Sequence, residues 1–298
     1  MRPPLLEWQV FRGSAAVAAG LLSVHQLRGR GWTRLRHDVY CDSRLAADHA
    51  LLCRATLARL PPESVVLAGP SAAHAHGVLS AAGPDDLVHL ILRADRRVGR
   101  QVGTRLHRVP LDPTDLCHVD LPGGSSLVLA TVPARTAWDA AVWLPLADAV
   151  ALTDGLLFRR LVTTAALREV AARLAERPGG RRAGHTLGLA DGHAASRAES
   201  LLRVRLFLAG LPMGVARPPI FTVAPCLAWP EFRVALFRTP DRAGEAVMID
   251  DGWLVLRLAP QTEFPEVVRH LRAALSGRGW RNTRKQDVVE SALSSTMR

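Results

Sequence analysis

Residues 11–40 read FRGSAAVAAGLLSVHQLRGRGWTRLRHDVY, and this stretch decides how the N-terminal part of the chain is expected to fold. Serines that can cap a helix and glycines that can close one predict short helices over 14–20 and 24–28. The alternation of side chains over 32–40 predicts a strand. Two short helices followed by a strand are the order of a minimal winged helix-turn-helix, so residues 1–60 are expected to form such a unit.

The same stretch is basic, and no acidic residue occurs between Glu7 and Asp38. In a winged helix, cations on the second helix and on the following strands face the phosphates of DNA. The alternative is a solvated basic face, and the short second helix leaves few side chains to contact base edges. The candidates for phosphate contact are Arg28, Arg30, Arg34 and Arg36. Gln26 is the candidate for contact with a base edge.

The whole composition points to the same class of partner. The 298 residues include 38 Lys and Arg against 27 Asp and Glu, and their formal charge is +11. Lys285 is the only lysine, and this preference for arginine is typical of a GC-rich bacterial genome, which weakens a functional interpretation of each arginine. The surplus positive charge still attracts polyanions, so double-stranded DNA is the expected partner.

The rest of the chain predicts a mixed α/β (α+β) fold of several parts. The middle part, 61–190, is expected to be α/β and to contain a loop over 178–184. A helix over 42–60 precedes it. Its predicted strands cover 65–68, 87–92, 105–109 and 126–131. Its predicted helices cover 70–75 and 133–176, and a new helix is expected to start at Pro145 within the second range.

A last domain is expected over 191–275, followed by a polar tail over 276–298. It is predicted to begin with a helix over 196–210 and to end with one over 264–275. Between them, strands are expected around Phe221, Val234 and Val255.

Several function classes find no support in the sequence. The four cysteines lie far apart and form no CxxC pair, which argues against a zinc knuckle and a disulfide framework. No apolar run is long enough for a membrane span or a signal peptide, so a cytoplasmic protein without a membrane partner is expected. The motifs GxSxG, HExxH and GxxxxGK[ST] do not occur.

Isolated residues that could carry chemistry have simpler interpretations. His74 and His76 stand two apart, so they face different directions on a helix and are expected to be packed or capping residues. Cys226 is expected to be a small buried residue of a strand. The aspartates of the middle helices are interpreted as surface or capping carboxylates; they are Asp139, Asp148 and Asp154.

Residues 11–40 resemble the N-terminal domain of AbiEi-type abortive-infection antitoxins, through FRGS, AGLLS, QLR, GWTRL and VY. The pieces LAGPSAA (67–73) and VPARTAWD (132–139) are similar to the middle part of the same actinobacterial group. The resemblance implies a winged helix that binds DNA and represses its own operon, with a cognate toxin as a possible partner.

The last domain resembles the very-short-patch-repair-like endonuclease domains that often end such chains. The similar pieces are RAESLLR (197–203), AGLP (209–212), LAWPE (227–231), RVA (233–235) and GWLVLR (252–257). The resemblance implies a restriction-endonuclease-like site, in which a helix glutamate, an aspartate entering one strand and an acidic pair on the next bind Mg²⁺.

This chain departs from that pattern at the metal ligands. Glu199 keeps the helix position, but Cys226 and Phe237 stand where the next two carboxylates are expected, and Thr239 replaces the last acid. A thiol and a phenyl ring are not ligands for Mg²⁺. The resemblance therefore implies a nuclease-like domain that does not cut DNA and needs no cofactor, and Glu199 can equally be a charge placed at a helix start.

Two alternatives stay open beside a DNA-binding, antitoxin-like regulator. The first is a working DNA endonuclease with migrated carboxylates, in which Glu199, Asp250 and Asp251 would hold Mg²⁺. The second is a protein-interaction module whose basic surface reflects genome composition alone.

Overall fold

The computed structural model describes residues 2–61, 63–93, 99, 102–121, 127–220, 224–239, 241–259 and 261–281. The chain divides into two compact units. The first contains Met1–Pro145 and Arg159–Gly188, and the second contains Leu146–Phe158 and Leu189–Arg298. Each combines helices with sheet, which confirms a mixed α/β fold. No helix of the described residues has the length and apolarity to cross a membrane.

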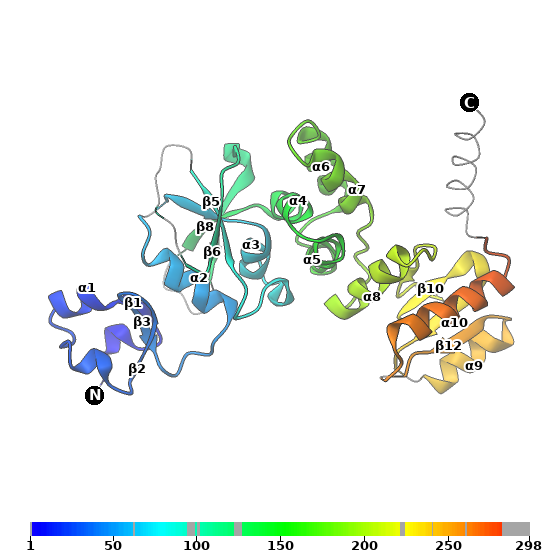
Figure 1. The fold of residues 1–298 in the computed structure, drawn as a ribbon, viewed down its shortest axis with the longest axis horizontal. Helices are drawn as coiled ribbons and strands as arrows, with labels where there is room; N and C mark the ends of the chain where they lie inside the picture. Colours follow the sequence, from blue (N-terminus) through cyan, green and yellow to red (C-terminus); the bar gives the residue numbers. More distant parts are fainter. Residues whose placement is uncertain are drawn as a thin grey trace, which may run out of the picture. The chain divides into compact units, whose positions relative to one another are not determined.

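The first unit begins with a small antiparallel sheet (blue in Figure 1), whose strand order is β1-β3-β2. Helix α1 and two 3-10 turns pack on it around a cluster that includes Leu6, Leu22 and Leu27, with Trp32 and Tyr40 at its edge. The elements are η1 (Pro4–Leu6), β1 (Val10–Arg12), α1 (Gly13–Ala18), η2 (Gln26–Arg28), β2 (Trp32–Arg36) and β3 (Val39–Asp42).

Two helices predicted near the N-terminus are shorter than expected. The second helix of the winged-helix pattern is only the 3-10 turn η2: Ser23 and Gln26 accept from each other's backbone N–H at its start, and the chain becomes extended at Gly29. The helix expected from residue 42 begins seven positions later as α2 (His49–Leu57), where the Asp48 carboxylate accepts from the Leu51 N–H. Asp42 instead ends β3.

A five-stranded sheet forms the middle of the first unit, in the order β6-β5-β4-β8-β7. Its central strands β4 and β5 are almost entirely apolar, and their successive side chains point to opposite faces of the sheet. Both faces are therefore buried. Helices α2 and α3 cover one face, and Trp143 packs on the other. The elements are β4 (Val65–Leu67), α3 (Gly69–Ala75), η3 (Leu79–Ala81), β5 (Val88–Leu92), β6 (Thr104–His107), η4 (Pro113–Asp115), β7 (Leu116–Asp120) and β8 (Leu127–Thr131).

Three helices complete the first unit, namely α4 (Pro133–Trp143), α6 (Thr164–Arg173) and α7 (Gly180–Gly188). Helices α4 and α6 are joined to η4, which directly precedes β7, by an ionic network centred on the buried Arg135, Asp139 and Asp115. The Arg135 guanidinium donates to Asp139 at 2.9 Å and to Asp115 at 2.7 Å, and Arg173 donates to Asp115 at 2.5 Å. Asp139 is fully buried, so its interpretation as a surface carboxylate was wrong.

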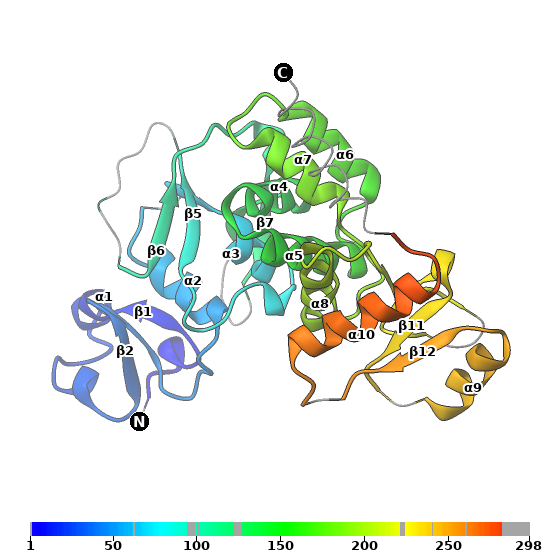
Figure 2. The same ribbon diagram turned by 45° about the vertical axis from the view of Figure 1, so that its right-hand side comes forward.

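The second unit is built on the sheet β12-β11-β10-β9. Helices α8 and α10 cover one face and α9 covers the other (Figure 2). Strands β9 to β11 are antiparallel, and β12 lies parallel to β11 after the α9 crossover. The elements are α5 (Leu146–Phe158), α8 (Arg197–Leu208), β9 (Val215–Ala216), β10 (Leu227–Trp229), η5 (Pro230–Phe232), β11 (Val234–Phe237), α9 (Arg242–Asp250), β12 (Leu254–Arg257) and α10 (Phe264–Gly277).

Of the other predictions from the sequence, some are confirmed and some are wrong. Pro145 does separate two helices, and His74 and Cys226 are buried as predicted. The loop expected over 178–184 is largely α7. Asp154 is not a surface residue but a buried partner of Arg203. The strand around Phe221 and the tail beyond residue 281 lie outside the described residues.

Candidate nucleic-acid interface

The β2–β3 hairpin turns at Asp38, whose φ of 59° lies in the left-handed region that Asp tolerates better than most residues. Its carboxylate accepts from the Ser14 N–H at 2.7 Å, from the Ser14 hydroxyl at 2.6 Å and from Arg12 at 3.1 Å. These bonds, those from Ser14 first, lower the pKa of Asp38. The hairpin tip is therefore fixed to the first turn of α1.

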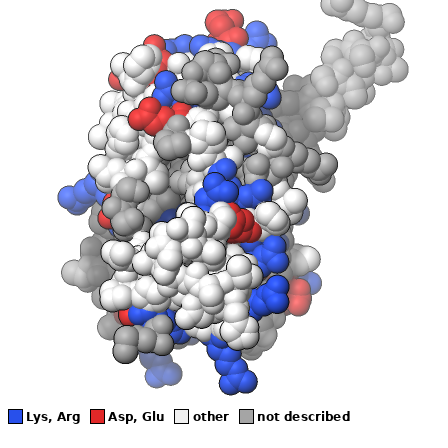
Figure 3. Space-filling view, turned by 90° about the vertical axis from the view of Figure 1, so that its left-hand side faces the viewer, with Lys and Arg blue, Asp and Glu red and all other residues white. Residues whose placement is uncertain are grey.

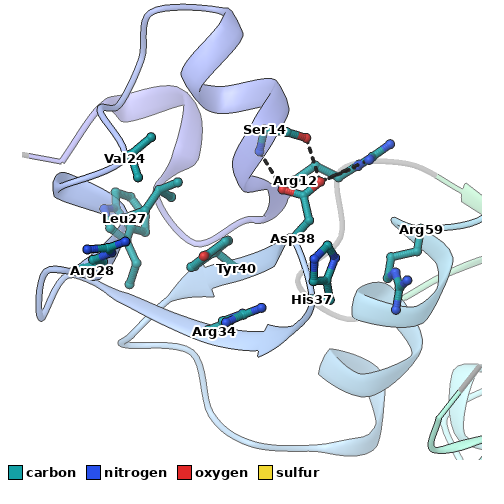
Figure 4. Close-up of a pocket in the computed structure, with 11 residues that line it drawn as sticks. Arg12, Ser14, Val24, Leu27, Arg28, Arg34, His37, Asp38, Tyr40 and Arg59 are labelled. Atoms are coloured by element: carbon teal, nitrogen blue, oxygen red, sulfur yellow. Dashed lines mark hydrogen bonds and ion pairs between the residues drawn. The ribbon is translucent and has the colours of Figure 1, made fainter.

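An open groove of about 800 Å³ lies between this hairpin, α1 and η2. Figure 4 shows Arg28 from η2 and Arg34 from β2 beside Tyr40, while Arg59, from just after α2, lies farther away, beyond His37. Apolar and aromatic side chains form much of the wall, and cations surround them. The lining residues are Arg12, Ser14, Val24, Leu27, Arg28, Trp32, Arg34, His37, Asp38, Tyr40 and Arg59.

The charge of the groove is positive and largely uncompensated. Among the described residues, Asp38 is the only acid that lines it, and Arg12 pairs with Asp38 at 3.1 Å. Within the described part of the chain, Arg28, Arg34 and Arg59 are exposed and pair with no acid. Figure 3 looks onto the side that carries α1 and shows arginines around a mainly uncharged central area. Such a concave basic surface raises the local potential for a polyanion.

Arg36 has a different place from the other candidate arginines. It is half-buried, and its guanidinium donates to the Val102 carbonyl. Burial, and after it the charge of Arg59, lowers the pKa of Arg36. This side chain joins the hairpin to the segment before β6, so a phosphate contact by Arg36 stays a prediction.

Gln26 and Arg30 are exposed but do not line the groove. The Gln26 side-chain oxygen accepts from the Ser23 N–H at 2.7 Å, which leaves its amide N–H groups to donate. Of the five candidate residues, the structure thus brings only Arg28 and Arg34 together in the groove. Contacts of Gln26 and Arg30 with DNA also remain predictions.

Sequence reasoning missed part of the groove. Arg12 reaches it from β1 and Arg59 from just after α2, and neither was among the candidate arginines. Trp32 and Tyr40 were assigned to a strand but not to a binding surface. No local pattern marks these residues, because their proximity arises from the packing of α2 and α1 against the hairpin.

A second candidate site is Glu199, in the first turn of α8. Its carboxylate is buried and accepts from Arg217 at 2.8 and 2.9 Å and from the Ala195 N–H at 3.0 Å. Burial alone would raise the pKa of Glu199, but the bonds from Arg217 and Ala195 lower it overall. Both carboxylate oxygens are engaged, so a guanidinium stands where a metal would need access to Glu199.

The neighbouring positions provide no carboxylate. Cys226 is buried, and its thiol donates to the Leu236 carbonyl at 3.1 Å. Burial and then Glu199 raise the pKa of this thiol to about 11, which keeps it protonated at neutral pH. Phe237 packs in the apolar cluster under α9. Asp250 and Asp251, the other two ligands of the endonuclease alternative, are exposed at the end of α9.

Among the described residues, no group of three His, Cys, Asp or Glu side chains could hold a metal ion. No family model matches the chain, and no curated protein matches it. The function is therefore inferred from the geometry of these two sites.

Proposed function

We propose that the chain binds double-stranded DNA through the basic groove and serves as a DNA-binding regulator. The observation that carries the proposal is that Arg28, Arg34 and Arg59 line one concave surface and have no acidic partners among the described residues. A guanidinium binds a phosphate through charge-assisted hydrogen bonds in a fork geometry. Several such groups around one groove can follow a phosphate backbone.

The groove suits phosphate contact better than extensive base recognition. The turn η2 is too short to present many side chains to base edges, and the side-chain oxygen of Gln26 already accepts from the Ser23 N–H. Phosphate contacts fix orientation but carry no sequence information directly. Within this proposal, a role as an antitoxin with a cognate toxin rests on the sequence resemblance alone.

We further propose that the second unit does not cleave DNA by a metal-dependent reaction. The support is chemical. The Arg217 guanidinium donates to both carboxylate oxygens of Glu199, and Cys226 and Phe237 provide a protonated thiol and a phenyl ring instead of carboxylates. Mg²⁺ requires oxygen ligands in near-octahedral geometry. Cleavage would need Arg217 to leave Glu199 and new carboxylates to arrive.

The DNA proposal is tested by measuring affinity for a random-sequence duplex at several salt concentrations. Each phosphate contact adds roughly one to the slope of log affinity against log salt, so Arg28→Ala with Arg34→Ala should reduce the slope by about two. The control is Arg168→Ala, an exposed arginine of α6 outside the groove. Equal slopes for the wild type and the double variant would refute this mode of binding, and a wild-type slope near zero would favour a protein-interaction module.

The cleavage proposal is tested by incubating supercoiled plasmid with the wild type and Mg²⁺ or Mn²⁺. We expect no metal-dependent nicking above the level of the Glu199→Ala variant. Nicking that needs the metal and disappears in Glu199→Ala or in Asp250→Ala with Asp251→Ala would establish the endonuclease alternative.

A further inference from the structure

A second cavity, of about 320 Å³, opens in the first unit away from the basic groove. It lies among α4, the segment that follows β6 and the residues that follow α6. Its volume is at the lower end of the range of small-molecule sites, roughly 300–1,000 Å³. The lining residues are Arg108, Val109, Pro110, Arg135, Trp138, Val142, Trp143, Leu174, Arg177 and Pro178.

Two tryptophans of the cavity wall, Trp138 and Trp143, are held in place by their neighbours. The Trp143 ring stacks on His107, with ring centroids 3.4 Å apart and planes 8° apart. Burial, and after it the charge of His89, lowers the pKa of His107 to about 3, so the stacked imidazole is neutral at neutral pH. Trp138 lies under the Arg135 guanidinium at 5.2 Å. Flat, immobilised rings of this kind favour an aromatic ligand.

The charged groups that line the cavity are all arginines. Arg135 is engaged by Asp115 at 2.7 Å and by Asp139 at 2.9 Å and is almost fully buried. Arg108 and Arg177 are exposed, and neither forms an ion pair within the described ranges. The cavity therefore combines an apolar aromatic interior with two uncompensated cations.

We propose that this cavity binds a small planar aromatic anion. Its ring would pack mainly against the half-buried Trp143, since Trp138 is only 3% exposed, and its carboxylate, sulfonate or phosphate would bind Arg108 and Arg177. Apolar burial and charge-assisted hydrogen bonds would then act on the same ligand. The site is independent of the proposed DNA binding, because its residues do not line the basic groove.

The test uses 1-anilinonaphthalene-8-sulfonate as the probe on the full chain, followed by fluorescence excited through tryptophan. We expect a saturable site that Arg108→Ala with Arg177→Ala weakens by about tenfold or more, since hydrogen bonds to charged groups are lost. The uncharged analogue N-phenyl-1-naphthylamine should bind correspondingly less tightly than the sulfonate.

Because the basic groove also pairs arginines with aromatic side chains, the matched control is Arg28→Ala with Arg34→Ala, which should leave this binding unchanged. All four side chains are exposed, so neither double variant should disturb the fold. Equal binding by the Arg108/Arg177 variant and the wild type, or loss of binding only in the Arg28/Arg34 variant, overturns the proposal. No DNA enters the measurement, so its failure would leave the DNA proposal standing.

Discussion

The interior of the first unit contains a buried arginine with two buried aspartates. Arg135 is shared by Asp115 and Asp139, and the second oxygen of Asp139 has no partner among the described residues. Burial raises the pKa of Asp139 to about 7, with Arg135 opposing the shift. A carboxyl in this position resists ionisation and makes stability depend on pH.

At this scale we predict a pH effect for Asp139→Asn. Because the pKa of Asp139 is higher in the folded state, its contribution to stability is complete below the unfolded value of 3.8 and is lost as pH rises toward about 7. The wild type should therefore lose stability relative to Asp139→Asn between pH 4 and pH 7, as measured by urea unfolding. The exposed Asp120→Asn should follow the wild type instead. Parallel profiles for the wild type and Asp139→Asn would contradict the shift.

The element that shapes the groove is the β2–β3 hairpin, and its position depends on Asp38. This residue supplies both a left-handed turn and the acceptor for α1. We predict that Asp38→Ala speeds amide hydrogen exchange over 10–18 and 32–42, reflecting a loss of about 1–3 kcal/mol of local stability.

Asn is the matched replacement, because it tolerates positive φ and keeps one acceptor oxygen. Asp38→Asn should therefore exchange at rates between those of the wild type and Asp38→Ala. If Ala and Asn produced the same exchange rates, the hydrogen bonds of Asp38 would not be what holds the hairpin to α1.

Elements with local signals could be predicted from the sequence. Helix α8 begins after the Ser196 cap, and Pro145 separates α4 from α5, both as expected. Strand β7 and helix α7 were not predicted, because β7 mixes polar and apolar side chains and α7 begins in a glycine-rich stretch. Local propensity was overridden there by pairing with β8 and packing on α4.

The candidate sites follow the same division. Charge along the chain pointed to Arg28 and Arg34, but Arg59 joins them only through the packing of α2. The bond between Glu199 and Arg217 joins the start of α8 to the residue after β9, and no sequence spacing relates these two positions. Residues that depend on long-range contacts were therefore the ones missed.

At the scale of the whole molecule, helix α5 belongs to the second unit although α6 and α7 of the first unit follow it in sequence. A buried ion pair joins it to α8, with Asp154 and Arg203 3.0 Å apart and at most 3% exposed. Nearer the surface, Asp148 pairs with Arg197, and both side chains are 35% exposed. The same two helices thus carry one buried and one half-exposed pair.

This arrangement predicts unequal effects for two aspartates of one helix. Asp154→Ala leaves the Arg203 charge buried without its partner and should cost about 3–5 kcal/mol, whereas Asp148→Ala should cost about 1 kcal/mol or less. Hydrogen exchange should accelerate over 146–158 and 189–208 together in Asp154→Ala, and 10–42 should be unaffected. A similar loss in both variants, measured by urea unfolding, would show that burial of the pair is not decisive.

The path of the chain between the two units also bears on how the protein is made. A ribosome releases the largely apolar α5 before α6 and α7 and well before α8, which supplies its packing surface. The first unit likewise cannot complete its fold until α7 has been synthesised, and α7 follows α5 in the sequence. During that interval the nascent chain exposes the apolar α5, because the rest of the second unit has not yet been made. This is the stage of synthesis at which a chaperone would bind or aggregation would begin.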